Sequence, residues 1–147
     1  MNILWWTRRD LRLADNALWD DIQERLSEPG SSLTILREPH NAEHARISES
    51  PLALPRMSST RQRWEEQAWE SFGYQVRQYG LSHRLVQGPL LDYLAKHHVD
   101  LVVFSHGYAW EERQAEKVLI ATGIAHQGFH TYTLFSPEEA LSAVLEP

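Results

Sequence analysis

The chain has 147 residues, with 14 Lys and Arg against 20 Asp and Glu, and therefore a formal net charge of −6. A chain of this length is expected to form one domain, residues 1–147, with a core of its own. It contains no Cys, which excludes disulfides and thiolate metal sites. Its acidic balance argues against direct binding of nucleic acid by general electrostatics.

The hydrophobicity pattern predicts neither a membrane span nor a signal peptide. The longest apolar run, residues 101–104, is far too short to span a membrane. The first ten residues have too short an apolar part for a signal peptide, and their charges follow that part rather than precede it. We therefore expect a cytoplasmic protein with no membrane partner.

Five short apolar runs predict strands. Residues 2–6, 33–36 and 101–104 are continuously apolar, which is typical of strands buried on both faces. Residues 84–86 and 124–129 are weaker runs and are expected at the sheet edges.

The first two helices are predicted between these strands. The first has Asp15 as its N-cap and buries Leu18, Ile22 and Leu26. The second spans residues 59–79 and ends at Gly80. Its expected buried side is Trp64, Ala68, Phe72, Val76 and Tyr79, with Trp69 beside it.

Three further helices follow. The third places Pro89 at its first position and buries Leu90 or Leu91, with Leu94 and His98. The fourth spans residues 110–122, and Gly123 with Ile124 predicts a left-handed cap. Its expected inward residues are Ala115, Val118, Leu119 and Thr122. The last begins with a capping box at Ser136.

Strict alternation of strands and helices predicts an α/β fold. We expect a Rossmann-like, doubly wound, five-stranded parallel sheet in the order 3-2-1-4-5, with helices on both faces. Ligands of such sheets bind at the carboxyl ends of the strands, where the strand order reverses. That point lies between the first and fourth strands. Residues 38–57 form a long aperiodic loop that is expected to close over a ligand.

The loops at this point are not glycine-rich: the first is polar, and the second is polar and aromatic. Residues 7–14 read TRRDLRLA and residues 105–110 read SHGYAW. The seven glycines are scattered, so neither G-x-G-x-x-G nor a P-loop is present. This argues against a Rossmann dehydrogenase and against a P-loop NTPase.

Residues 5–18, WWTRRDLRLADNAL, resemble the N-terminal signature of the DNA photolyase/cryptochrome family, W-x-R-x-D-L-R-x-x-D-N-x-A-L. The matched positions are Trp6, Arg8, Asp10, Leu11, Arg12, Asp15 and Asn16, followed directly by Ala17 and Leu18 where the signature has one further residue before its Ala-Leu. Further stretches resemble the family in the same order. They are Arg63-Trp64 with Glu70-Ser71, residues 85–89 (LVQGP), residues 108–113 (YAWEER) and residues 134–137 (LFSP).

The resemblance covers the smaller of the family's two domains, the α/β antenna domain. It implies a light-harvesting module that holds methenyltetrahydrofolate, a deazaflavin or flavin mononucleotide. FAD is held by the family's helical domain, which the chain lacks, so FAD is not expected here. The chain alone is expected not to repair DNA. Within a longer protein the resemblance implies deoxyribodipyrimidine photolyase activity, with that helical domain or another protein as the partner.

The motif residues also have plain structural interpretations. Asp10 between Arg8 and Arg12 can hold both guanidinium groups and brace the loop, or the arginines can form a basic rim for an anionic chromophore. Asp15 and Asn16 are interpreted as helix-capping residues. Glu111 and Glu112 suit a helix N-terminus electrostatically. By resemblance, Glu112 matches a glutamate that binds the pterin of a folate antenna, whereas Glu111 stands where the folate pattern often has Asn.

We expect the chromophore to lie between the first and fourth strand ends, with Trp6 or Trp110 against the ring face and Glu112 at its donor edge. The expected lining residues are Trp6, Arg8, Arg37, Glu38, Tyr108, Trp110, Glu111 and Glu112. The other tryptophans on the helical and strand patterns are expected in the core. These are Trp5, Trp19, Trp64 and Trp69.

Other functions remain open on the same scaffold. The principal alternative is a standalone α/β protein that binds a nucleotide or a protein partner. A hydrolase that uses Ser105 and His106 is a weaker one, because no nucleophile-elbow glycines are present. His40 and His44 have a spacing compatible with metal binding, but no third ligand is evident, so no metal site is expected.

Overall fold

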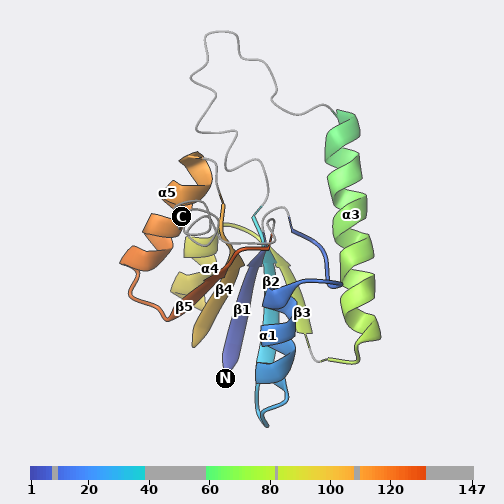
Figure 1. The fold of residues 1–147 in the computed structure, drawn as a ribbon. Helices are drawn as coiled ribbons and strands as arrows, with labels where there is room; N and C mark the ends of the chain where they lie inside the picture. The colour runs from blue at the N-terminus through green and yellow to red at the C-terminus, as the bar shows by residue number, and fades with distance from the viewer. Residues whose placement is uncertain (8–9, 39–58, 82, 108–109, 132–147) are drawn as a thin grey trace, which may run out of the picture.

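A computed structural model describes residues 1–7, 10–38, 59–81, 83–107 and 110–131 of the chain, without the side chains of residues 61, 62, 110 and 111 (Figure 1). Its centre is a five-stranded sheet in the order β3-β2-β1-β4-β5, and every pairing is parallel. The strands are β1 (Asn2–Thr7), β2 (Ser32–Arg37), β3 (His83–Gln87), β4 (Leu101–Ser105) and β5 (His126–Phe129). The predicted strand order is confirmed, and β1 lies at its centre.

Four helices are described around the sheet. They are α1 (Ala17–Leu26), α3 (Ser59–Gln78), α4 (Leu90–Lys96) and α5 (Trp110–Ala121). The Rossmann-like α/β fold is therefore confirmed for these elements. The predicted helix that begins at Ser136 and the predicted loop beyond Glu38 lie outside the described residues.

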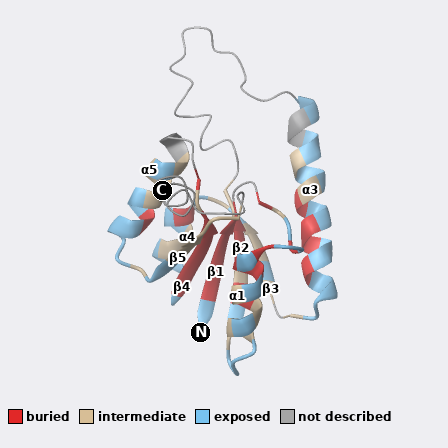
Figure 2. Cartoon of the chain, in the orientation of Figure 1, coloured by how far each residue is buried: buried red, intermediate tan, exposed pale blue. Residues whose placement is uncertain are grey.

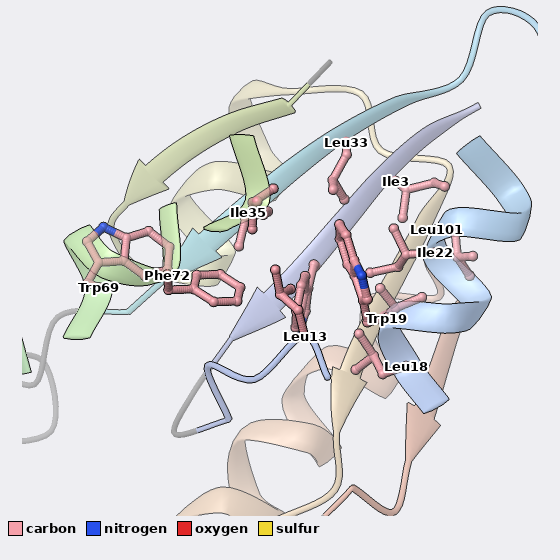
Figure 3. Packing of buried hydrophobic residues seen from close by; sticks show 13 residues of the cluster. Ile3, Leu13, Leu18, Trp19, Ile22, Leu33, Ile35, Trp69, Phe72 and Leu101 are labelled. Carbon is pink, nitrogen blue, oxygen red and sulfur yellow. The ribbon is translucent and has the colours of Figure 1, made fainter. Parts of the chain in front are cut away.

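Side chains of the central strands alternate between two cores, because successive residues of a strand point to opposite faces. Ile3 and Trp5 point toward α1 and α3, and they pack with Trp19 and Phe72 (Figure 3). Leu4 and Trp6 point toward α4 and α5, where their cluster is completed by Leu36, Leu90, Val102, Phe104 and Leu119. Burial on both faces explains why these strands read as continuous apolar runs.

The first core is rich in aromatic rings. The rings of Trp5 and Trp19 stack with their centroids 5.7 Å apart, and Trp5 meets Phe72 edge-on at 5.3 Å. Trp69 stacks on Phe72 at 5.9 Å. The core positions predicted for Trp5, Trp19 and Trp69 are therefore confirmed.

The start of α1 differs from the prediction. Asn16, and not Asp15, is the N-cap, because the Asn16 side chain accepts a hydrogen bond from the N–H of Leu18 at 3.1 Å. Asp15 instead adopts a left-handed conformation with φ of 52°. This turn reverses the chain just before the helix. At α4, Pro89 is the N-cap rather than the first helical residue.

Some predicted core positions are exposed. Trp64 is 65% exposed, because it lies on the side of α3 that faces away from the buried residues Trp69, Phe72 and Val76. The first half of α3 also extends past the carboxyl edge of the sheet (Figure 1). Tyr79 and Val118 are 50% and 45% exposed. His98 lies beyond the end of α4, where its side chain is solvent-exposed, and Thr122 is exposed beyond α5.

The ends of the other elements follow the predictions closely. Gly80 and Gly123 have φ of 66° and 72°, so each supplies the left-handed conformation at the end of a helix. Ile124 packs against the second core but precedes β5, which begins at His126. None of the described helices is long and apolar enough to cross a membrane.

Candidate functional site

The strand order reverses at the carboxyl ends of β1 and β4. The two strands pair directly, with Trp6 in register with Phe104. From there the chain leaves β1 toward α1 on one face and leaves β4 toward α5 on the other face. This arrangement creates the switch point at which doubly wound sheets bind ligands.

Buried polar side chains gather at this edge. Among the described residues, the buried polar or charged side chains are Thr7, Asp10, Asn16 and Ser105. Thr7 ends β1, Asp10 and Asn16 lie between β1 and α1, and Ser105 ends β4. Burying a polar group is costly unless it is hydrogen-bonded, so this edge is built differently from the apolar remainder of the core.

The loop after β1 is braced by the motif residues. Arg12 donates to Asp10 Oδ1 from its Nε at 3.2 Å and from its backbone N–H at 3.3 Å. Its Nη2 donates to the carbonyl oxygen of Thr131, which follows β5, at 2.6 Å. Asn16 Nδ2 donates to the carbonyl oxygen of Arg12 at 2.8 Å. These bonds join the loop after β1 to the end of β5 across the switch point.

Asp10 retains one unsatisfied oxygen. The residue is 4% exposed, and its Oδ2 has no hydrogen-bond partner among the described residues. A buried carboxylate oxygen without a donor is energetically unfavourable. It therefore provides an acceptor for a donor group at this edge of the sheet.

The loop after β4 is fixed by a carboxylate on α5. Glu116 Oε1 accepts the backbone N–H of Gly107 at 2.7 Å, and Glu116 Oε2 lies 3.3 Å from Nδ1 of His106. Glu112, one turn earlier on α5, lies directly against Gly107, where a Cβ would overlap the Glu112 side chain. The glycine therefore lets Glu112 approach the turn, and the Glu112 side chain is half-buried there.

Two residues after β5 complete the described part of this edge. Thr131 Oγ1 donates to Ser105 Oγ at 2.8 Å, and the rings of His130 and His106 lie 4.6 Å apart between centroids. The sequence interpretation did not include Glu116, His130 or Thr131. Two signals identify them: Glu116 is four residues after Glu112 on one helix, and His130 and Thr131 follow a strand that ends at the same edge.

The predicted site residues are only partly brought together. Trp6 is 1% exposed and packs on Phe104 at 5.8 Å, so its ring is a core element rather than an open stacking surface. Arg37 turns toward α3, with its Nη2 3.8 Å from Glu65 Oε2 and its guanidinium 5.8 Å from the centroid of Trp69. The side chains of Trp6 and Arg37 therefore contribute to packing, because helices cover the faces of the sheet from which these side chains project.

Glu38 and the remaining predicted residues have separate positions. Glu38 Oε1 accepts the backbone N–H of Leu90 at 2.6 Å, which caps the start of α4. Trp110 is the first residue of α5 and Glu111 the second, and their side chains are not described. Arg8, Tyr108, His40 and His44 lie outside the described residues.

Ser105 and His106, the residues considered for a hydrolase, both lie among the described residues. Ser105 and His106 are consecutive, and the Ser105 hydroxyl bonds Thr131 whereas the imidazole pairs with Glu116. Ser105 and His106 therefore do not form a nucleophile and base pair with each other. No group of three or more potential metal ligands occurs in the part of the chain that the structure describes.

Comparisons with known proteins identified no relative of the chain. No protein-family model, no curated protein and no solved structure matches the chain.

Proposed function

We propose that the protein is a chromophore-binding domain of the photolyase/cryptochrome antenna type, with its site at the carboxyl ends of β1 and β4. The observation that carries the proposal is the gathering of buried polar side chains at this switch point, in and beside the segment that resembles the family signature. The second resembling segment, residues 108–113, contains Glu112, which lies against Gly107 at the same edge.

The acceptors at this edge suit a ring with adjacent N–H donors. Asp10 Oδ2 lacks a donor among the described residues, and Glu112 offers a half-buried carboxylate. A reduced folate presents such donors side by side on its pterin ring, whereas a deazaflavin and flavin mononucleotide each present one ring N–H. In this proposal Glu112 orients the ring, and Asp10 accepts a hydrogen bond from a ring N–H. The hydrogen bond from Arg12 to the carbonyl oxygen of Thr131 holds the loop after β1 against the end of β5. The bound group would supply absorption of near-ultraviolet or blue light.

The stacking role in this proposal passes from Trp6 to Trp110. Trp6 is packed in the core between the sheet and helices α4 and α5, where it supports the site by holding β1 against β4. Trp110 begins α5, directly after the loop that leaves β4. Replacement of each tryptophan should therefore separate a loss of folding, at Trp6, from a loss of chromophore affinity, at Trp110.

A titration of the purified chain tests the proposal. Methenyltetrahydrofolate, a deazaflavin and flavin mononucleotide are each added and followed by fluorescence, with adenosine monophosphate in a fourth arm. We expect one of the three chromophores to bind, and Glu112→Gln to weaken it about ten- to hundredfold, because a charged acceptor is lost. Glu24→Gln is the matched control, since Glu24 is an exposed glutamate on α1.

Three results would overturn this function. Binding of none of the chromophores would remove the antenna role. Equal affinity in wild type and Glu112→Gln would remove Glu112 from the site and leave it as a residue of the helix N-terminus. Binding of adenosine monophosphate alone would favour the alternative of a standalone nucleotide-binding protein on the same fold.

A further inference from the structure

The outer side of α3 carries an uncharged row of side chains. The residues of this row begin at Thr60 and follow one another at alternating intervals of four and three. This spacing places them along one side of a helix with about 3.6 residues per turn. They are Thr60, Trp64, Gln67, Ser71, Tyr74 and Gln78, and all are exposed. We call this set the α3 row. Such spacing is the a/d pattern of helices that pack against another helix.

The α3 row lies opposite the side of α3 that enters the core. Trp69, Phe72 and Val76 face the sheet, whereas Trp64 and Tyr74 are 65% and 62% exposed. Figure 2 shows the buried side of α3 turned to the sheet and the exposed side turned outward. A chain with 23% charged residues would ordinarily place charge on such a face. Two large aromatic rings stand there instead.

Charged residues of opposite sign flank the row on one side. Arg63 and Glu70 are both exposed and lie seven residues apart, each one position before a row residue. In an antiparallel pair of helices, flanking positions of the same kind face each other across the contact. Two copies of α3 can therefore place Arg63 of each opposite Glu70 of the other.

We propose that α3 packs antiparallel on α3 of a second copy of this chain, which forms a two-fold symmetric dimer through the first half of the helix. In this register Trp64 packs against Gln67 of the partner, Thr60 against the partner's Ser71, and each Arg63 pairs with the partner's Glu70. An isologous contact of this kind uses one patch twice, so a neutral row suits it. The chain's net charge of −6 opposes association least where the contact surface is uncharged.

Charge selects this register over its neighbour. A shift by one heptad would pair Trp64 with the partner's Tyr74, but it would also place Glu70 against the partner's Glu70 and Arg63 against the partner's Arg77. Like charges in these positions are repulsive. The proposed register is centred on the first half of α3, which extends past the sheet (Figure 1). The row faces away from the core, so each sheet lies on the side of its own α3 away from the partner.

The proposed contact between the two helices is small. One helix pair over about four turns buries an area at or below the lower end of stable interfaces, about 1,200 Å² in total. The dimer is therefore concentration-dependent. Trp64 is its principal contact, because a buried Trp at the centre of an interface carries a large share of the binding free energy.

Sedimentation equilibrium over about 1 to 200 µM protein tests the dimer. We expect reversible dimerisation in wild type and a dissociation constant at least about tenfold higher in Trp64→Ser. Ile120→Ser is the matched control, because Ile120 is 54% exposed on α5 and lies outside the α3 row. Far-ultraviolet circular dichroism at each concentration establishes that the variants are folded.

Charge reversal tests the partner and the register together. Arg63→Glu and Glu70→Arg should each weaken the dimer, because each places two like charges in contact. The double variant Arg63→Glu with Glu70→Arg should restore it. A chain that stays monomeric throughout, a dimer unaffected by Trp64→Ser, or a double variant as weak as the single ones would each overturn the proposal.

Spin labels report the orientation of the helices. The chain has no Cys, so a single introduced Cys is labelled at one position. Labels at Glu66→Cys lie close to the two-fold axis, whereas labels at Gln78→Cys lie about 37 Å apart along the helices at 1.5 Å per residue. A parallel pair would give similar distances for both positions and would refute the antiparallel dimer.

Discussion

Glu38, the residue that follows β2, accepts the backbone N–H of Leu90 through its Oε1 at 2.6 Å. The sequence interpretation placed Glu38 in the wall of the ligand site. Its carboxylate instead satisfies an orphan donor at the start of α4, where a negative charge also suits the helix dipole. This contact joins two elements that are more than fifty residues apart in sequence and anchors α4 on the second face of the sheet.

Because Glu38 caps α4, we expect its replacement to lower the stability of the fold without lowering the affinity for the chromophore. Glu38→Ala removes the capping carboxylate and should lower the free energy of unfolding by about 0.5–2 kcal/mol. Urea unfolding measures this change, with Glu24→Ala as the control on α1. An affinity for the chromophore reduced as much as in Glu112→Gln would instead return Glu38 to the site.

Truncation of two tryptophans should change the stability of the fold by very different amounts. Trp6 is 1% exposed in the second core, so Trp6→Ala should cost about 3–5 kcal/mol of stability. Trp64 is 65% exposed, so Trp64→Ala should change stability by about 0.5 kcal/mol or less at concentrations below those that allow dimers. Chemical unfolding of both variants is the measurement, and similar losses in the two would contradict the burial described for α3 and β1.

Gly128 and His106 should be energetically coupled. A Cβ at Gly128 would overlap the imidazole of His106, so Gly128→Ala is expected to destabilise the fold by about 1–3 kcal/mol. His106→Ala removes the ring that causes the overlap and should make Gly128→Ala nearly neutral in that background. A double-mutant cycle by urea unfolding reads this coupling directly. Additive effects of the two substitutions would show that the ring does not occupy this space.

Asp100 should make stability depend on pH in the acid range. The backbone N–H of Asn2 donates to its Oδ2 at 2.6 Å, and this hydrogen bond, followed by the nearby His98, lowers the pKa of Asp100. A lowered pKa in the folded state gives stability that is present above the unfolded-state pKa, about 4, and is lost as the pH falls through the folded-state pKa. The contribution belongs to an exposed group and is screened by solvent.

Replacement of Asp100 isolates that contribution. Asp100→Asn should be less stable than wild type at pH 7, and the difference should shrink as the pH falls below about 4. Asp92→Asn, an exposed aspartate on α4, is the control. Unfolding curves at several pH values give the comparison, and a difference that is constant with pH would show that Asp100 does not titrate differently on folding.

The sequence by itself determined the sheet and its order. The continuous apolar runs of β1, β2 and β4 require burial on both faces, and alternation with helices then permits few connections. It also located the switch point, because the predicted strand order reverses between β1 and β4. What such patterns describe is local: a period, a cap or a run of one residue type.

Only the tertiary structure decided what each side chain at that edge contacts. Trp6 alternates with Trp5 along β1 and looks identical in sequence, but the faces on which α4 and α5 pack decide that it is buried. Trp64 was predicted on the buried side of α3 but is exposed, because the packing of Trp69, Phe72 and Val76 against the sheet turns Trp64 outward. Arg37 and Glu38 point to opposite faces because successive residues along a strand do so. Which helix each side chain meets, α3 for Arg37 and the start of α4 for Glu38, is a long-range property that no local pattern contains.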